Sequence, residues 1–134
     1  MEEIRGRLGA KQTLLLILLP MLGTFSCLRL YLHLVRVQHV YPGGILVHHL
    51  FFGVVIALPA AFVLAFGASS KVTAVAARVA LGIGSGLMLD EVVYLTATRA
   101  TDEDYVSKIS LFGAIGFIAA AMLLLVSFYW RHRE

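Results

Sequence analysis

Four long apolar stretches, separated by short breaks rich in glycine, proline or charge, account for most of the chain. They run over residues 13–37, 44–67, 72–98 and 108–130. A helix needs about 20 mostly apolar residues to cross the hydrocarbon core of a bilayer, and each stretch reaches that length. The pattern therefore predicts an all-α fold, a four-helix transmembrane bundle that forms a single integral membrane domain over residues 1–134.

The breaks between the stretches carry residues that end helices. Residues 41–44 (Tyr-Pro-Gly-Gly) form a turn signal, and residues 67–71 form a loop of small residues. Residues 99–104 are charged and contain Thr101 and two aspartates. Because threonine and aspartate side chains accept hydrogen bonds from the free amides of a helix start, we expect this run to cap the fourth span.

One segment of the first span also fits a different structure. Residues 28–34 alternate apolar and polar positions with period two, as a half-buried strand does. A single strand in lipid leaves its backbone amides and carbonyls without partners. We therefore expect helix here as well.

The composition agrees with a membrane protein. Hydrophobic residues make up 60% of the chain and charged residues 14%, and the mean hydropathy is +0.88, whereas soluble domains have about 45–50% apolar and about 25% charged residues. A soluble enzyme and a disordered chain are both excluded on this ground. The one cysteine excludes an internal disulfide and a Cys-x-x-Cys motif. The net charge of +3 is small, so we expect membrane lipid, and no nucleic acid, as a partner.

Lysine and arginine positions predict the orientation, because they concentrate on the cytoplasmic side of membrane proteins. The two termini and the 67–71 loop share one side of a four-span protein, and that side carries seven: Arg5, Arg7, Lys11, Lys71, Arg78, Arg131 and Arg133. The other side carries four, Arg29, Arg36, Arg99 and Lys108, together with three acidic residues. Both termini are therefore expected to be cytoplasmic, in a membrane of the prokaryotic cytoplasmic type.

Ionisable side chains inside the spans indicate where function lies, since each costs about 2.5–3.5 kcal/mol on insertion and needs a partner or a role. They fall near the predicted outer ends of the first three spans: Arg29 and His33, then His48 and His49, then Asp90 and Glu91. Because three helices place such residues at one level, we expect one polar cluster in the outer half of the bundle.

Helical spacing predicts which of these side chains face inward. Asp90 shares a face with Gly82 and Gly86, and His49 shares one with Gly53 and small residues beyond it. Ridges of small residues let neighbouring helices approach closely. We therefore expect Asp90 and His49 to face the bundle interior, and His48 and Glu91 to point elsewhere.

Two imidazoles and two carboxylates are a typical ligand set for divalent zinc, iron or manganese. The sequence therefore predicts a metal centre near the extracytoplasmic face with ligands His48, His49, Asp90 and Glu91, surrounded by Arg29, His33, Arg36 and Tyr94 as outer-shell or substrate-binding residues. A metal-bound water is a nucleophile at neutral pH. This interpretation indicates a metal-dependent hydrolase or transferase acting on lipid-like substrates, with Arg29 and Arg36 positioned to hold a phosphate.

Two other functions stay open. Histidines and carboxylates in a bundle also relay protons or pass cations, although the inner halves of the spans hold almost no polar residues. Alternatively, Arg29 pairs with Asp90 or Glu91 in a buried ion-pair network that only fixes the helices. The chain would then be an accessory subunit that packs against further copies of itself or a larger membrane complex. A pocket open to the outer face favours the enzyme, a polar path favours transport, and a closed, fully paired cluster favours the accessory role.

Three short motifs resemble those of a group of small prokaryotic polytopic membrane proteins, most of them uncharacterised. The second span opens with HH-x-x-x-G at residues 48–53, the third has a glycine-rich run ending in L-x-x-DE at residues 82–91, and D-Y-x-S follows at residues 104–107. Val106 stands where that group commonly has tryptophan. The resemblance implies a four-helix membrane protein, carries no established activity, adds Tyr105 to the outer-shell residues, and marks as signature residues His48, His49, Gly53, Asp90, Glu91 and Tyr105.

Overall fold

The computed structural model describes residues 8–35 and 47–133, and regular structure in these ranges is helical. The helices are α1 (Ala10–Leu34), α2 (His49–Phe66), α3 (Lys71–Ala97), α4 (Asp102–Tyr105) and α5 (Lys108–Arg131). All but the short α4 are long and apolar enough to cross a membrane. The predicted all-α four-helix bundle is confirmed, and residues 28–34 are helical as expected.

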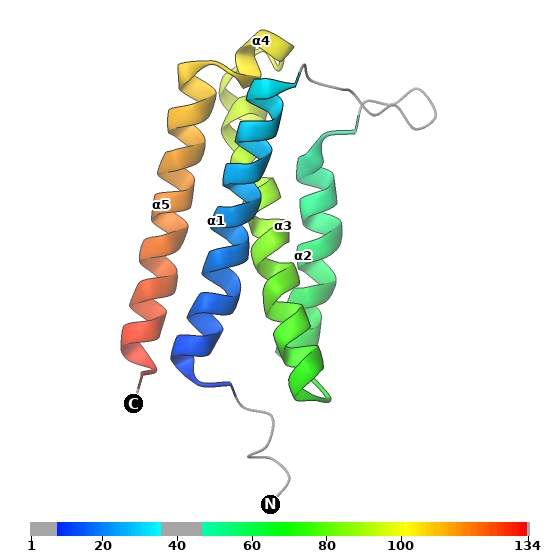
Figure 1. Ribbon diagram of the computed structural model, residues 1–134, viewed down its shortest axis with the longest axis vertical. Helices are drawn as coiled ribbons and strands as arrows, with labels where there is room; N and C mark the ends of the chain where they lie inside the picture. The colour runs from blue at the N-terminus through cyan, green and yellow to red at the C-terminus, as the bar shows by residue number, and fades with distance from the viewer. Residues whose placement is uncertain (1–7, 36–46, 134) are drawn as a thin grey trace, which may run out of the picture.

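Helix α3 is the centre of the bundle. Helices α1, α2 and α5 each pack against it, and α1 also contacts α5. Among the described helices, α2 packs only against α3. The start of α1 and the end of α5 lie at one end of the bundle, and α4 covers the opposite end (Figure 1).

Small residues bring α2 and α3 into direct backbone contact. A Cβ atom on Gly84 would lie 2.6 Å from the carbonyl oxygen of Gly53, and one on Gly53 would lie 2.7 Å from that of Gly84. Gly82 and Gly86 lie against α1 in the same manner. This confirms the predicted small-residue ridges, and large apolar side chains are left to face outward, as they do in lipid.

The helix ends differ from the sequence expectation in two places. Thr101 caps α4 in a reciprocal capping box with Asp104, and Ser107 caps α5 by accepting a hydrogen bond from the Ser110 amide. The prediction that the 99–104 run caps the fourth span was therefore wrong, because Thr101 in that run caps the start of the separate helix α4. Helix α2 begins at His49, whereas Gly44 and the rest of the 36–46 segment lie outside the described residues.

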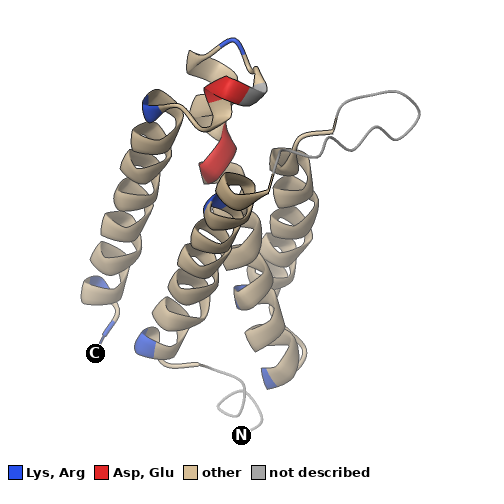
Figure 2. Ribbon diagram, turned by 45° about the horizontal axis from the view of Figure 1, so that its top comes forward, with Lys and Arg blue, Asp and Glu red and all other residues tan. Residues whose placement is uncertain are grey.

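Charged residues divide between the two ends of the bundle. Figure 2 shows lysine and arginine at both ends of the bundle, whereas the acidic residues of the described ranges lie at the α4 end. Arg29 of α1 forms an ion pair with one of them, Asp90. The arrangement is that of a four-span protein whose termini share a side, and the cytoplasmic location of that side stays a prediction.

Candidate functional site

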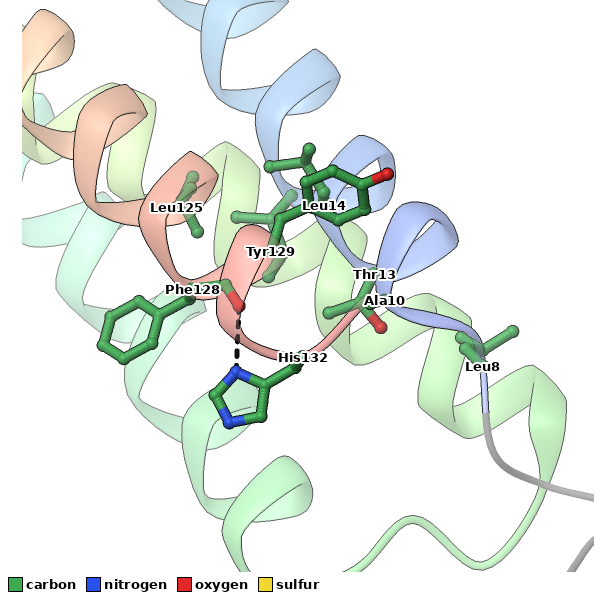
Figure 3. A pocket seen from close by; sticks show the side chains of 9 residues that line it. Leu8, Ala10, Thr13, Leu14, Leu125, Phe128, Tyr129 and His132 are labelled. Carbon is green, nitrogen blue, oxygen red and sulfur yellow. Dashed lines mark hydrogen bonds between the residues drawn. The ribbon is translucent and has the colours of Figure 1, made fainter. Parts of the chain in front are cut away.

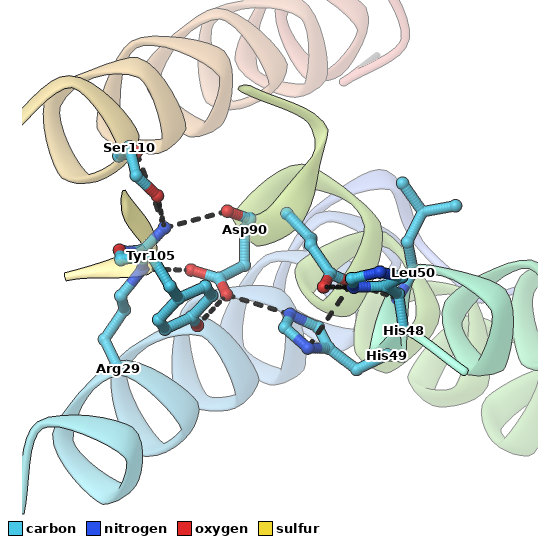
Figure 4. A network of polar contacts seen from close by, with 8 residues as sticks. Arg29, His48, His49, Leu50, Asp90, Tyr105 and Ser110 are labelled. Carbon is cyan, nitrogen blue, oxygen red and sulfur yellow. Dashed lines mark hydrogen bonds and ion pairs between the residues drawn. The ribbon is translucent and has the colours of Figure 1, made fainter. Parts of the chain in front are cut away.

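The site begins with Asp90, a fully buried residue of α3 that faces α1. The Nε atom of Arg29, from α1, donates a hydrogen bond to Oδ1 of the Asp90 carboxylate. The Nη2 atom of Arg29 donates to the backbone carbonyl of Asp90 over 2.8 Å. Arg29 therefore pairs with both the charge and the main chain of Asp90 (Figure 4).

Arg29 also binds the two elements that follow α3. Its Nη1 atom donates to the backbone carbonyl of Tyr105 over 2.8 Å, and its Nη2 atom lies 3.1 Å from the hydroxyl of Ser110 on α5. The guanidinium carbon is 4.4 Å from the centroid of the Tyr105 ring, a cation–π contact. One arginine thus connects α1 to α3, α4 and α5.

Tyr105, the last residue of α4, donates its hydroxyl hydrogen to Oδ2 of Asp90. Burial raises the pKa of the Tyr105 hydroxyl well above its usual range, and the neighbouring Asp90 carboxylate raises it further. The hydroxyl therefore remains a donor at any physiological pH. Its ring packs edge-on against His49, with the centroids 5.9 Å apart.

His49, the first residue of α2, lies between the two carboxylates. Its Nε2 atom is 3.0 Å from Oδ2 of Asp90, and its Nδ1 atom is 3.4 Å from Oε2 of Glu91. Both ring nitrogens therefore face a carboxylate oxygen. The predicted inward orientation of Asp90 and His49 is confirmed.

Glu91 is buried too, with 2% of its surface exposed. Its Oε1 atom is 2.6 Å from Nδ1 of His48, and its Oε2 atom accepts a hydrogen bond of 2.7 Å from the Leu50 amide. The prediction that Glu91 and His48 point away from the cluster was wrong. The physical reason is that the amides of a helix start lack intrahelical partners, and the Glu91 carboxylate satisfies one of them for α2.

These contacts form what we call the His–carboxylate network: Arg29, His48, His49, Asp90, Glu91, Tyr105 and Ser110. Each of the four carboxylate oxygens faces a protein donor. Within residues 8–35 and 47–133, no buried side-chain nitrogen or oxygen lacks a partner. The same ranges hold no group of three or more His, Cys, Asp or Glu side chains arranged to hold a metal ion. The residue types predicted for a metal centre are therefore brought together, but as donor–acceptor pairs.

The remaining predicted residues lie around or outside the network. His33 is exposed in the last turn of α1 and lines a cavity of about 380 Å³ beside Arg29 and Tyr105. The Tyr94 hydroxyl donates to the backbone carbonyl of Ala100 over 2.7 Å, which supports the turn before α4. Its ring also lies 6.0 Å from that of His48. Arg36 falls outside the described residues.

Ser110 and the Leu50 amide were not predicted as parts of the site. The predicted site rested on ionisable residues, and Ser110 is a neutral residue one turn into the fourth span. Its position near the level of Asp90 is the feature of the sequence from which its part in the site could have been predicted. The Leu50 amide is part of the site only because α2 begins at His49, which leaves this amide free to donate to Glu91.

No protein family, curated protein or solved structure matches this chain. The resemblance that the sequence motifs carry stays a prediction.

Proposed function

We propose that this chain is a proton-responsive integral membrane protein, in which the His–carboxylate network binds one exchangeable proton at the α4 end of the bundle. The observation that supports this is the position of His49 between two carboxylates. A neutral imidazole carries one N–H hydrogen. An additional proton on His49 or on Glu91 lets both nitrogen–oxygen contacts be attractive.

The charges of the network support the same proposal. Arg29 contributes one positive charge, and Asp90 and Glu91 contribute one negative charge each. With both histidines neutral, the sum is one negative charge, and one bound proton makes it zero. Since an uncompensated charge is costly inside a membrane protein, binding the proton stabilises the folded bundle.

The histidines give this proton a route to solvent. The side chains of His48 and His49 are each 19% exposed, while those of Asp90 and Glu91 are 0% and 3% exposed. Both histidines stand where α2 begins, at the end of the bundle rather than at its centre. Protons therefore exchange through the imidazoles, and the buried carboxylates hold the charge that attracts them.

The described helices offer no continuation of this route toward the other end. Residues 14–28 of α1, 50–66 of α2, 79–89 of α3 and 109–128 of α5 contain no Asp, Glu, His, Lys or Arg. A proton taken up by the network therefore leaves on the side from which it came. This favours a proton-sensing role over the proton- or cation-conducting transport function considered from the sequence.

The metal-dependent hydrolase or transferase has less support from this geometry. A metal ligated by Asp90 would compete with Arg29, Tyr105 and His49 for the carboxylate. A metal ligated by Glu91 would compete with His48 and the Leu50 amide.

The accessory-subunit role is the second candidate, and the complete pairing of the buried polar groups in the described ranges favours it. In that case, the network holds α1, α2, α3 and α5 in register and its protonation does not change in the working pH range. The two candidates therefore differ in one measurable property, the proton uptake of the network.

The test combines two measurements on the protein in lipid bilayers: nitrogen-15 NMR of labelled histidine and infrared spectra of the carboxyl groups. Both run from about pH 5 to about pH 9, the range in which histidine ordinarily titrates. We expect the spectra to show that one residue of the network gains a proton as the pH falls. The variants His49→Gln and Glu91→Gln assign the signal to its residue. His132→Gln removes a histidine at the opposite end and serves as the control. Unchanged protonation of every network residue across this range, in a protein that stays folded, would overturn the sensing role and leave the accessory role.

A further inference from the structure

A second feature lies at the opposite end of the molecule, between α1 and α5. Two cavities of about 340 Å³ each open along this seam. They share the lining residues Ile17, Leu125 and Phe128, so they adjoin each other. We call the two cavities together the α1–α5 groove, and Figure 3 shows the one at the ends of α1 and α5.

The deep part of the α1–α5 groove is almost entirely apolar. It is lined by Leu81 and Met88 of α3, by Met21 of α1 and by Leu124 of α5. Ser85 is the single hydroxyl-bearing residue in this lining. Such a surface suits a hydrocarbon chain, and it gives a polar ligand almost nothing to bind.

The mouth of the groove is mainly apolar but carries three polar side chains. It is lined by Thr13 of α1 and by Tyr129 and His132 at the end of α5. The His132 Nδ1 atom lies 2.9 Å from the Phe128 carbonyl, which fixes the ring at the helix end. Apart from Ser85, the polar side chains of the groove lining are thus at its mouth.

Arg78 of α3 does not line either cavity, but it contacts Thr13, which lines the mouth, and so places a positive charge next to it. Its Nε atom donates to the Thr13 hydroxyl over 3.1 Å, and its Nη1 atom donates to the Ala74 carbonyl over 2.8 Å. Both partners are neutral oxygens, and no carboxylate of the described residues forms an ion pair with Arg78. Arginine remains charged at any physiological pH, so this half-buried guanidinium has the capacity to bind an anion from outside the chain.

We propose that the α1–α5 groove binds one anionic phospholipid, with an acyl chain between α1 and α5 and its phosphate beside Arg78 and Thr13. The apolar depth fits the chain, and the charge at the mouth complements the phosphate. Lys11, Arg131 and Arg133 at the same end add to the positive field that attracts anionic lipids. This site is separate from the His–carboxylate network and does not depend on the proposed proton binding.

Native mass spectrometry of the full chain in mild detergent tests this proposal, with phosphatidylglycerol and phosphatidylcholine of equal chain length as the probes. We expect the wild type to retain phosphatidylglycerol in preference. Arg78→Gln should weaken that retention by about tenfold, since it removes a charge-assisted hydrogen bond, and should leave phosphatidylcholine unaffected.

A matched pair of variants on α5 tests the groove itself. Ala121→Phe fills the groove that Ala121 lines, whereas Ala119→Phe adds the same volume at an exposed position outside that lining. We expect Ala121→Phe to lose the bound lipid and Ala119→Phe to keep it. If Ala121→Phe does not fold, Ser85→Leu in the same lining replaces it.

Two results would overturn the lipid site. One is equal lipid retention by folded groove-filling variants and Ala119→Phe. The other is displacement of phosphatidylglycerol by inorganic phosphate alone, which would indicate a free-anion site at Arg78 in place of a lipid site.

Discussion

Arg29 donates to both the carboxylate and the backbone carbonyl of Asp90, so one side chain of α1 fixes both the charge and the main chain of α3. The pair lies where α4 and α5 also converge. A buried ion pair of this kind contributes little net free energy compared with apolar residues, but loss of one partner leaves the other charge uncompensated.

Asp90→Asn should therefore lower the free energy of unfolding by about 3–5 kcal/mol, because it leaves the Arg29 charge without its anion. Denaturation in mixed detergent micelles measures this change. Arg29→Gln combined with Asp90→Asn should lose clearly less than the sum of the single variants, since contacting residues are not additive. Strict additivity would mean that the two side chains do not interact.

Tyr105→Phe should change the alkaline stability of the protein. The pKa of the Tyr105 hydroxyl is raised in the folded state, mainly by burial. Stability from this group is therefore full below the ordinary tyrosine pKa of about 10 and decreases as the pH rises above it. We expect the wild type to lose stability above about pH 10 and Tyr105→Phe to lose less over the same interval. Tyr129→Phe, in the last turn of α5, is the control for tyrosine removal.

Glu91→Ala should make the amides at the start of α2 exchange their hydrogens faster. The Glu91 carboxylate accepts the hydrogen bond of the Leu50 amide, and without it this amide has no intrahelical partner. Hydrogen–deuterium exchange should therefore be faster at the first turn of α2 and unchanged in the middle of α5. Glu103→Ala removes an exposed carboxylate of α4 and should leave α2 unaffected. Equal exchange at Leu50 in wild type and Glu91→Ala would contradict this capping role.

Gly84→Ala should weaken the contact between α2 and α3. The added Cβ atom would meet the Gly53 carbonyl at 2.6 Å, so the two backbones must separate. We expect a loss of about 1–3 kcal/mol, the usual effect of overpacking, measured as a lower thermal midpoint. Gly116→Ala is the matched control, because a Cβ there meets nothing within 4 Å, and it should leave stability unchanged or slightly raised.

Divalent metal should add nothing to the stability of the protein. The carboxylate oxygens of Asp90 and Glu91 already face protein donors, so zinc, iron or manganese would compete with these contacts. We expect an unchanged thermal midpoint on addition of each ion to protein purified without chelator or affinity tag. Stoichiometric metal in elemental analysis, lost in His49→Ala and Asp90→Ala, would restore the metal-centre hypothesis.

The spans and the location of the polar cluster follow from the sequence for a physical reason. Long apolar runs have few structures available in lipid, and ionisable residues there must find partners. The shared level of Arg29, His49 and Asp90 along three predicted helices is therefore enough to indicate contact between them. The ridge of Gly82 and Gly86 likewise indicates close helix packing, and both features are present in the fold.

The Arg29–Asp90 pair is one of the alternatives that the sequence left open, and the structure contains it, but the sequence did not select it over a metal centre. Histidines and carboxylates are the same residue types in a metal centre and in an ion-pair network, and the position of Arg29 relative to Asp90 decides between them only in three dimensions. The orientation of Glu91 depended on where α2 begins, since its partner is a backbone amide. Hydrophobic patterns place helix ends only to within a few residues.

The packing of α2 against α3 alone has a consequence for biosynthesis. When the first two spans enter the membrane, α2 has no described helix to pack against, because its contacts are on α3. The arginine of α1 likewise enters the membrane before its carboxylate partner, which lies 61 residues later in the chain. Helices of membrane proteins insert first and associate afterwards. The third span therefore supplies the contacts that join α1 and α2 into one bundle, and α5 packs against α3 and α1 after it.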